Sequence, residues 1–363
     1  MVTGEPTSRE TLVIFTCGKE PYSLRDLLDA GLFRGDMASP WQQFTHRVAC
    51  KKEADRQRLS ADEASLDVAA EEFRYRHDLI TAEETEKWLA GFGVTLDAFS
   101  EYFVRDYFAS VLGDEVEAPP IDYLSSAPDL QELFQVYLIL SDELSGFATR
   151  CSWRAAASQE GRNQTVAAGL IKTEEKRFFA REGIGRSTLS EWLEQLGREM
   201  AWFEKQILTE ANFRQQGTAL LTPRMRQREL AALRLPLTRF DAEIIEFDSH
   251  EAAREAFLCA RDDGLSLAEI AAEGRYPYRN SELVLESIDS ELQSKFFSLV
   301  PGSLLEPLAR GDGFELCKII GKHEPDGEDP AVRDRIEQDI LTRHFNELAA
   351  RHVTWHVRLE SME

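Results

Sequence analysis

The hydrophobic pattern of this chain changes its period near Phe240, and this change constrains the fold more than any other feature. From about residue 22 to residue 234, apolar residues recur at the spacing of amphipathic helices. Over Asp241–Phe247 they alternate with polar residues, as in a strand with one buried face. A long helical part followed by a part with strands is typical of an α+β fold, which is predicted here to be mostly α.

Local signals predict one strand and then a series of helices at the N-terminal end. Thr11–Cys17 is β-branched and apolar, which predicts the strand. Ser23, Ser60 and Thr81 are each followed three residues later by an acidic residue, the arrangement of a helix capping box. The expected core residues of this helical series are Phe73, Trp88, Leu89, Leu96, Phe99 and Phe103.

The helical part repeats itself after about 104 residues. The segment 73–80, with Trp88 after it, has a counterpart in 177–184, with Trp192 after it. In both copies an aromatic residue follows the tryptophan by eleven positions, with a glycine between them. We expect a duplicated helical unit over roughly 22–111 and 126–212, although two unrelated amphipathic stretches could also produce this similarity.

Punctuating residues divide the chain into four predicted domains. Prolines cluster at 119–128, and a break is expected at 215–217. The change in period near Phe240 marks the start of the third domain. The apolar helical stripe that begins after Asp329-Pro330 marks the fourth. The predicted domains are 1–118, 119–234, 235–325 and 326–363.

The two ends of the chain are predicted to meet. Leu12–Phe15 and Val353–Val357 are short strand-like segments, and each adjoins an amphipathic helix that must bury its apolar stripe. We expect them to pair in one small sheet against the N-terminal helices.

Charge and cysteine usage limit the classes of partner and cofactor. The formal net charge of −23 repels nucleic-acid backbones, so nucleic acid is not an expected partner. No apolar run is long enough to insert into a membrane. Five scattered cysteines without CxxC spacing indicate reduced thiols in a cytoplasmic protein, and neither a metal site nor a cofactor is expected.

One acidic stretch is a candidate for binding a basic, apolar peptide. From Asp106 through Thr149 there are nine acidic residues and no lysine or arginine. Phe134 and Tyr137 are the aromatic residues proposed to contact the peptide there. The alternative is that both side chains are buried between the two helical units.

The segment after Phe240 resembles the SurA and PpiC-like parvulin family of peptidyl-prolyl isomerases and chaperones. The resemblance is carried by Ser298-Leu-Val-Pro-Gly302, Glu306-Pro307 and Gly311-Asp-Gly-Phe-Glu-Leu-Cys-Lys-Ile319, and it covers about 85 residues. It implies a parvulin-like α/β module preceded by SurA-N-like helical units. The C-terminal helix and strand are then expected to return to the N-terminal lobe, as in SurA-like chaperones.

The resemblance also implies where the site residues lie. The family has two central histidines, and the matching positions here hold Glu243 and Glu315. We expect the two carboxylates to lie close together, where they could share a proton. The family's proline-binding positions match Leu285, Ile288, Leu292 and Phe296, which could equally be core residues.

The function implied is that of a peptide-binding, SurA-like chaperone or accessory protein with a degenerate isomerase module. Its client would be an extended peptide or unfolded protein, basic and apolar, such as a peptide undergoing maturation or export. Two alternatives are an active prolyl isomerase and a non-catalytic scaffold for one folded partner.

Overall fold

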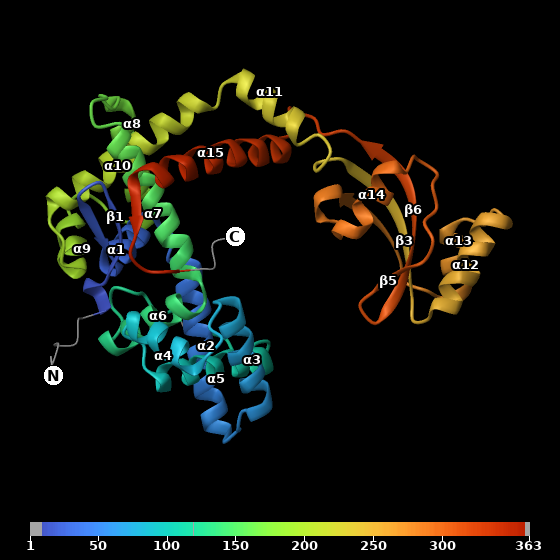
Figure 1. Ribbon diagram of the computed structural model, residues 1–363, viewed down its shortest axis with the longest axis horizontal. Coiled ribbons are helices and arrows are strands. Elements are labelled where there is room, and N and C mark those ends of the chain that lie inside the picture. The colour runs from blue at the N-terminus through green and yellow to red at the C-terminus, as the bar shows by residue number, and fades with distance from the viewer. Residues whose placement is uncertain (1–8, 119, 360–363) are drawn as a thin grey trace. The chain divides into compact units, whose positions relative to one another are not determined.

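The computed structural model describes residues 9–118 and 120–359 and divides the chain into two compact units (Figure 1). One unit contains the chain up to Thr218 together with the residues from His344 onward, and the other is Ala219–Arg343. The first unit therefore combines most of the segments 1–118 and 119–234 with the end of 326–363.

A three-stranded antiparallel sheet joins the two ends of the chain in the first unit, and it confirms the predicted pairing. Strand β1 (Val13–Cys17) lies between β2 (Glu20–Ser23) and β7 (Val353–Trp355). Phe15 is opposite Trp355, and the two rings are 5.2 Å apart at an edge-to-face angle. A short 3₁₀ helix (Arg9–Thr11) precedes the sheet.

The rest of the first unit is helical, as the apolar period predicts. No helix within residues 9–118 and 120–359 combines the length and apolarity needed to cross a bilayer. The helices are α1 (Leu24–Arg34), α2 (Ala38–Gln57), α3 (Glu63–Arg76), α4 (Ala82–Gly91), α5 (Leu96–Leu112), α6 (Pro128–Leu140), α7 (Glu143–Glu160), α8 (Ala168–Glu182), α9 (Leu189–Leu196) and α10 (Met200–Leu220).

Two of the three predicted capping boxes are present. Ser23 and Thr81 cap α1 and α4, and the backbone amide of each donates a reciprocal hydrogen bond to the acidic side chain three positions on. The prediction at Ser60 is wrong. Helix α3 begins after Asp62, whose carboxylate accepts a hydrogen bond from the Ser65 amide at 2.9 Å.

The break predicted at 215–217 is also wrong, because α10 continues to Leu220. Neighbouring segments hold both glutamines within the helix. The Gln216 amide donates to the Ala157 carbonyl at 2.8 Å, and Gln215 accepts from the Ala167 amide at 3.0 Å. These contacts offset the roughly 1 kcal/mol that a helical glycine such as Gly217 costs.

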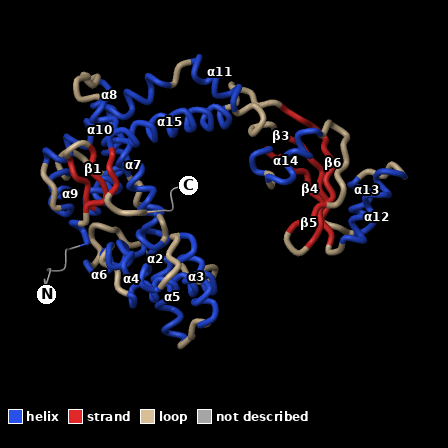
Figure 2. Tube along the Cα trace, in the orientation of Figure 1, coloured by secondary structure: helices blue, strands red, loops and turns tan. Residues whose placement is uncertain are grey.

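The second unit is built around a four-stranded antiparallel sheet in the order β4-β3-β6-β5 (Figure 2). Helices α12 and α13 cover one face of this sheet and α14 covers the other (Figure 1). The elements are α11 (Pro223–Ala232), β3 (Arg239–Phe247), α12 (His250–Asp262), α13 (Leu267–Gly274), β4 (Tyr278–Val284), a 3₁₀ helix (Leu285–Ser287), α14 (Ser290–Ser298), β5 (Leu308–Arg310), β6 (Gly313–His323) and α15 (Pro330–His352), which runs into the first unit.

Two strands of this sheet differ from the prediction. β4 was not predicted, because Tyr278–Val284 is mostly polar and becomes a strand through its pairing with β3. Leu304–Leu308, a segment whose apolar residues also predict a strand, forms only a single bridge at Leu304, and β5 begins at Leu308. Pro307, which has no amide hydrogen to donate, separates the two.

Candidate peptide-binding site

The two glutamates at the expected histidine positions lie on opposite faces of the four-stranded sheet. Side chains alternate along β3, so Glu243 shares a face with Ile245, which is buried under α12 and α13. Glu315 on β6 shares the other face with Cys317 and Ile319, which are buried with Phe296 of α14. The expectation that the two carboxylates lie close together and share a proton is therefore wrong.

The strand register gives the same result. Glu243 is opposite Lys318 on β6, whereas Glu315 is opposite Glu246 on β3. Alternation along a strand shows which of its residues share a face. Which face of the common sheet they occupy depends on the register with the neighbouring strand, and the sequence does not give that register.

Glu315 is held in a network of arginines. Its carboxylate accepts from the Arg279 guanidinium at 2.7 Å and lies 3.7 Å from Arg310. Arg279 also bonds Glu246, so one guanidinium bridges the two carboxylates that face each other across the ladder. Glu315 is 9% exposed, yet it lines a cavity of about 530 Å³ at the end of the sheet.

The thiol beside Glu315 is not a nucleophile near neutral pH. Burial, followed by the negative charge of Glu315, raises the pKa of Cys317 to about 12. Cys317 therefore acts as a small apolar core residue on this face.

Glu243 lies in a different environment on the face of α12 and α13. It accepts a hydrogen bond from the Tyr278 hydroxyl at 3.0 Å. Burial and the adjacent Glu243 raise the pKa of Tyr278, which keeps the phenol a neutral donor. Glu243 is thus bonded to the edge strand β4.

The four predicted proline-binding residues come together in one apolar cluster with Phe240. Leu285 and Phe296 are buried, and the Phe296 ring is edge-to-face with Phe240 at 5.8 Å. Ile288 and Leu292 are only partly buried against this cluster. Leu285 and Phe296 are thus core residues of the second unit, whereas Ile288 and Leu292 keep some surface that a ligand could contact.

Phe134 and Tyr137, by contrast, do not form a surface groove. Phe134 is fully buried and Tyr137 is 3% exposed, both within the main core of the first unit. Phe134 contacts Trp41 edge-to-face at 5.0 Å and Phe44 at 5.4 Å. Both rings are therefore buried, as the alternative interpretation states, because α6 is apolar on most of its surface and must be covered by other helices.

The end of α14 carries exposed apolar side chains that sequence reasoning missed. Phe297 is 46% exposed and Val300 is 62% exposed. The Phe296-Phe297 pair was a usable signal, since two adjacent helical residues cannot both face the sheet. Lys322 bonds the Phe297 and Leu299 carbonyls and lies 4.9 Å from the Phe297 ring centre, so a cation borders this surface.

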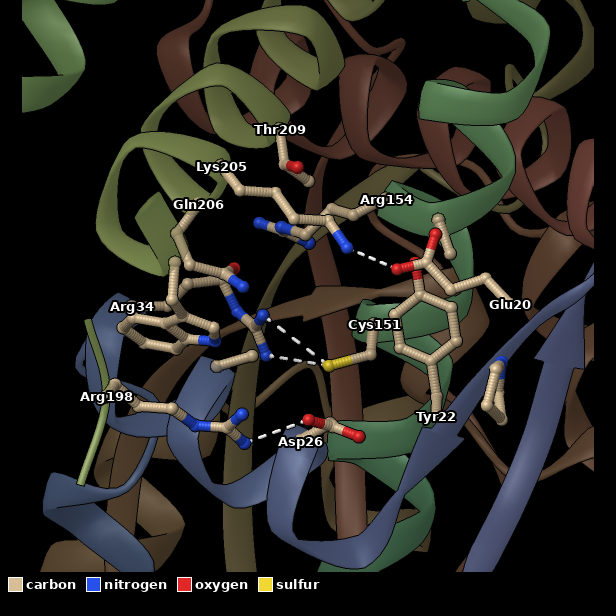
Figure 3. A pocket seen from close by; sticks show the side chains of 14 residues that line it. Glu20, Tyr22, Asp26, Arg34, Cys151, Arg154, Arg198, Lys205, Gln206 and Thr209 are labelled. Carbon is tan, nitrogen blue, oxygen red and sulfur yellow. Dashed lines mark hydrogen bonds and ion pairs between the residues drawn. The ribbon is translucent and has the colours of Figure 1, made fainter. Parts of the chain in front are cut away.

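A second missed site is a pocket in the first unit, lined by basic side chains that are distant in the sequence (Figure 3). Arg34 of α1 and Arg154 of α7 meet Arg198 and Lys205 there. No local spacing links these residues, because the pocket forms only when the helices pack together.

No family model and no curated protein matches this chain. A search of solved structures finds partial similarity to the peptidylprolyl isomerase PrsA from Bacillus anthracis, with 16% identity and a TM-score of 0.29, covering 54% of this chain and 93% of that one. PrsA from Bacillus cereus has 15% identity and a TM-score of 0.38, covering 58% and 83%. A SurA-like chaperone from Campylobacter jejuni has 9% identity and a TM-score of 0.20, covering 59% and 88%. These PrsA isomerases and this SurA-like chaperone are thus solved structures similar to parts of this chain.

Proposed function

We propose that this protein binds extended or unfolded peptide segments as a SurA-like chaperone or accessory protein, and that its isomerase-like module is degenerate. The observation that carries the proposal is that the sheet of the second unit has an apolar cluster but no converging catalytic groups. The apolar cluster under α14 is present, while the two positions expected to hold catalytic histidines carry glutamates on opposite faces.

The arrangement of the glutamates argues against efficient catalysis. Rotation about a peptide bond has a barrier of about 18–20 kcal/mol, and polar groups lower it only when they converge on one amide. Groups on opposite faces of a sheet cannot both contact the same bond. Glu315, which lies on the sheet face that α14 covers, is also neutralised by Arg279 and Arg310.

Binding does not need such convergence. Ile288, Leu292, Phe297 and Val300, which we call the α14 surface, are partly or largely exposed along α14 and its flanking loops. Apolar side chains of a peptide would gain affinity by covering this surface. β4 lies at the edge of the same sheet, where a peptide strand could add through main-chain hydrogen bonds.

The proposal includes a duplicated SurA-N-like helical part in the first unit. In the first copy, the rings of Phe73 and Trp88 are edge-to-face at 5.6 Å. In the second copy, those of Phe178 and Trp192 are edge-to-face at 5.1 Å. Two matching aromatic clusters, each with a glycine of positive φ after it (Gly93 and Gly197), favour one unit used twice.

The client and the compartment belong to the same proposal. The family resemblance favours a peptide that undergoes maturation or export. All five cysteines are free thiols, which favours a reducing compartment such as the cytoplasm.

Two assays on the full-length protein test the proposal. In a coupled assay on a proline tetrapeptide we expect a rate near background. In fluorescence anisotropy with a labelled basic, apolar peptide we expect binding that the double variant Phe297→Ser, Val300→Ser weakens about tenfold.

The matched control is the double variant Leu258→Ser, Leu265→Ser, which removes two exposed apolar side chains, 39% and 38% exposed, on and near α12. We expect it to bind normally. A strong rate enhancement that disappears in Glu315→Gln would favour the active isomerase instead. Equal binding by both double variants would remove the α14 surface from the proposal.

A further inference from the structure

The pocket in Figure 3 lies in the first unit among β2, α1, α7 and α10 and has a volume of about 170 Å³. We call it the arginine pocket. Arg34, Arg154, Arg198 and Lys205 supply the basic part of its lining.

The lining of the arginine pocket has more cationic than acidic side chains, in a chain whose net charge is −23. Four cationic and two acidic side chains line it. Arg198 bonds Asp26 at 2.9 Å and Lys205 bonds Glu20 (Figure 3), so the two acids are already paired. Arg154 bonds Glu210 at 2.6 Å, outside the lining, so Arg34 is the cation that remains to be considered.

Arg34 is the most informative of these residues. Its side chain is 6% exposed, and its Nε bonds the Asp36 carboxylate at 2.8 Å. Both terminal nitrogens point at the Cys151 sulfur, at 3.6 and 3.5 Å (Figure 3). Sulfur is a weak acceptor, so within the described residues these two groups have no oxygen acceptor.

A buried guanidinium in this position stays charged and attracts anions. Burial works against its charge, but the interactions with Cys151 and Asp36 outweigh burial and raise the pKa of Arg34 above its usual value. Leaving charged N–H groups without oxygen partners costs free energy that an oxyanion would recover.

Neutral donors complete the pocket. Among the residues that the structure describes, the side chains of Tyr22, Gln206 and Thr209 have no hydrogen-bond partner in the protein. Burial raises the pKa of Tyr22, so its hydroxyl remains a donor. These groups, which lie on β2 and α10, could bond the amide that precedes a bound carboxylate.

The size of the pocket limits the ligand. A cavity of about 150 Å³ accommodates a benzene molecule, so 170 Å³ suits one residue and not a length of extended chain. Its apolar lining, from Pro21, Ala30, Ala155 and Trp202, would contact the side chain of that residue.

We propose that the arginine pocket binds the C-terminal carboxylate of a client peptide together with its last side chain. This inference rests on the proposed peptide-binding function and adds a site to it. Guanidinium groups bond carboxylates in a planar, bidentate manner, and the Arg34 terminal nitrogens supply such a pair. Phosphate has the same chemistry, so the experiment must separate the two sources.

The experiment measures binding to the full-length protein by fluorescence anisotropy. The probe is a short apolar peptide, labelled at its N-terminus and ending in a free carboxylate, compared with the same peptide ending in an amide. We expect the free acid to bind at least tenfold more tightly. Arg34→Met should remove most of this difference, and Lys205→Met, which removes a half-exposed cation from the same lining, should reduce it severalfold.

Lys172→Met on the exposed surface of α8 is the control and should bind both peptides normally. If Arg34→Met fails to fold, Lys205→Met alone decides the result. Equal affinity for the acid and the amide would overturn this inference and leave the α14 surface untouched. Inorganic phosphate that competes as strongly as the free acid would make the pocket a site for free oxyanions and overturn the assignment to a chain end.

Discussion

At the scale of single residues, the two glutamates show how differently similar side chains can act. Glu315 is 9% exposed and paired with two arginines, whereas Glu243 is partly exposed and accepts one bond from Tyr278. Removing the charge of Glu315 leaves Arg279 and Arg310 without their shared partner. If Gln replaces Glu243, its amide oxygen can still accept the hydrogen bond from the Tyr278 hydroxyl.

We therefore expect Glu315→Gln to lower the free energy of unfolding by about 1–3 kcal/mol. Glu243→Gln serves as the matched variant and should change it by less than about 0.5 kcal/mol. Urea titration followed by circular dichroism would measure both. Equal effects of the two substitutions would contradict the different environments assigned to these carboxylates.

Phe134 allows a direct test of core against surface. Its ring is fully buried among Trp41, Phe44 and Tyr123. Phe134→Ala should lower the free energy of unfolding by about 3–5 kcal/mol. Phe134→Leu keeps most of the volume and should cost less. A folded Phe134→Ala protein of unchanged stability that loses peptide binding would return the ring to a surface role.

Asp29 beside the arginine pocket makes stability depend on pH. Burial raises the pKa of this carboxyl to about 6, although Arg198 at 2.5 Å and Arg25 favour its charged form and Asp26 opposes it. In the unfolded chain the pKa is about 3.9. Between these values the folded state holds a proton that the unfolded state has lost, so stability falls as pH rises from about 4 to 6.

We expect this group to contribute a loss of about 2–3 kcal/mol over that range. Asp29→Asn should remove that part of the pH dependence. The measurement is the difference in unfolding free energy between the two proteins at pH 4 and at pH 7. A difference that does not change with pH would show that the carboxyl titrates at its ordinary value.

At the scale of elements, the sheet that joins the chain ends is the clearest long-range contact. The His356 amide donates to Ile14 at 2.9 Å and the Gly18 amide donates to His352 at 3.0 Å. Because hydrogen-bonded pairs alternate along an antiparallel ladder, the Thr354 amide also faces β1, opposite Thr16.

Thr354→Pro removes this donor, and we expect it to lower the Tm of the first unit by more than about 4 °C. Thr354→Ala keeps the amide and is the matched control, because the side chain is exposed. Differential scanning calorimetry of the full-length protein would compare them. An equal and small effect of both substitutions would mean that β7 adds little to stability.

At the scale of the whole molecule, the net charge of −23 is the property most able to influence encounter with a client. An acidic protein attracts a basic peptide over a distance that salt shortens to about 8 Å at physiological ionic strength. Apolar contact at the α14 surface would supply most of the affinity, and charge would mainly raise the association rate.

Binding of a basic, apolar peptide should therefore weaken severalfold as salt rises from low to physiological levels, without disappearing. A peptide in which glutamine replaces each lysine should show almost no salt dependence. Stopped-flow anisotropy would locate the effect in the association rate. A salt effect confined to the dissociation rate would contradict steering by net charge.

Features that depend on neighbouring residues could be predicted from the sequence alone. Capping residues such as Ser23 and Thr81 predicted helix starts, since a cap acts within one turn. Alternating apolar residues predicted β3, and the two terminal strands had enough pattern to predict their pairing. The order of helices followed by a mixed unit was predictable for the same reason.

Which side chains meet depends on packing between distant segments and could be learned only from the folded chain. Glu243 and Glu315 are separated by the register between β3 and β6, because one position along a strand changes the face of the sheet. Phe134 is a core residue because helices from distant segments cover α6. Arg34 and Cys151 are 117 positions apart and meet only when α1 packs against α7. Such contacts form only when the helices and strands pack together. The spacing of residues along the sequence does not show how that packing occurs.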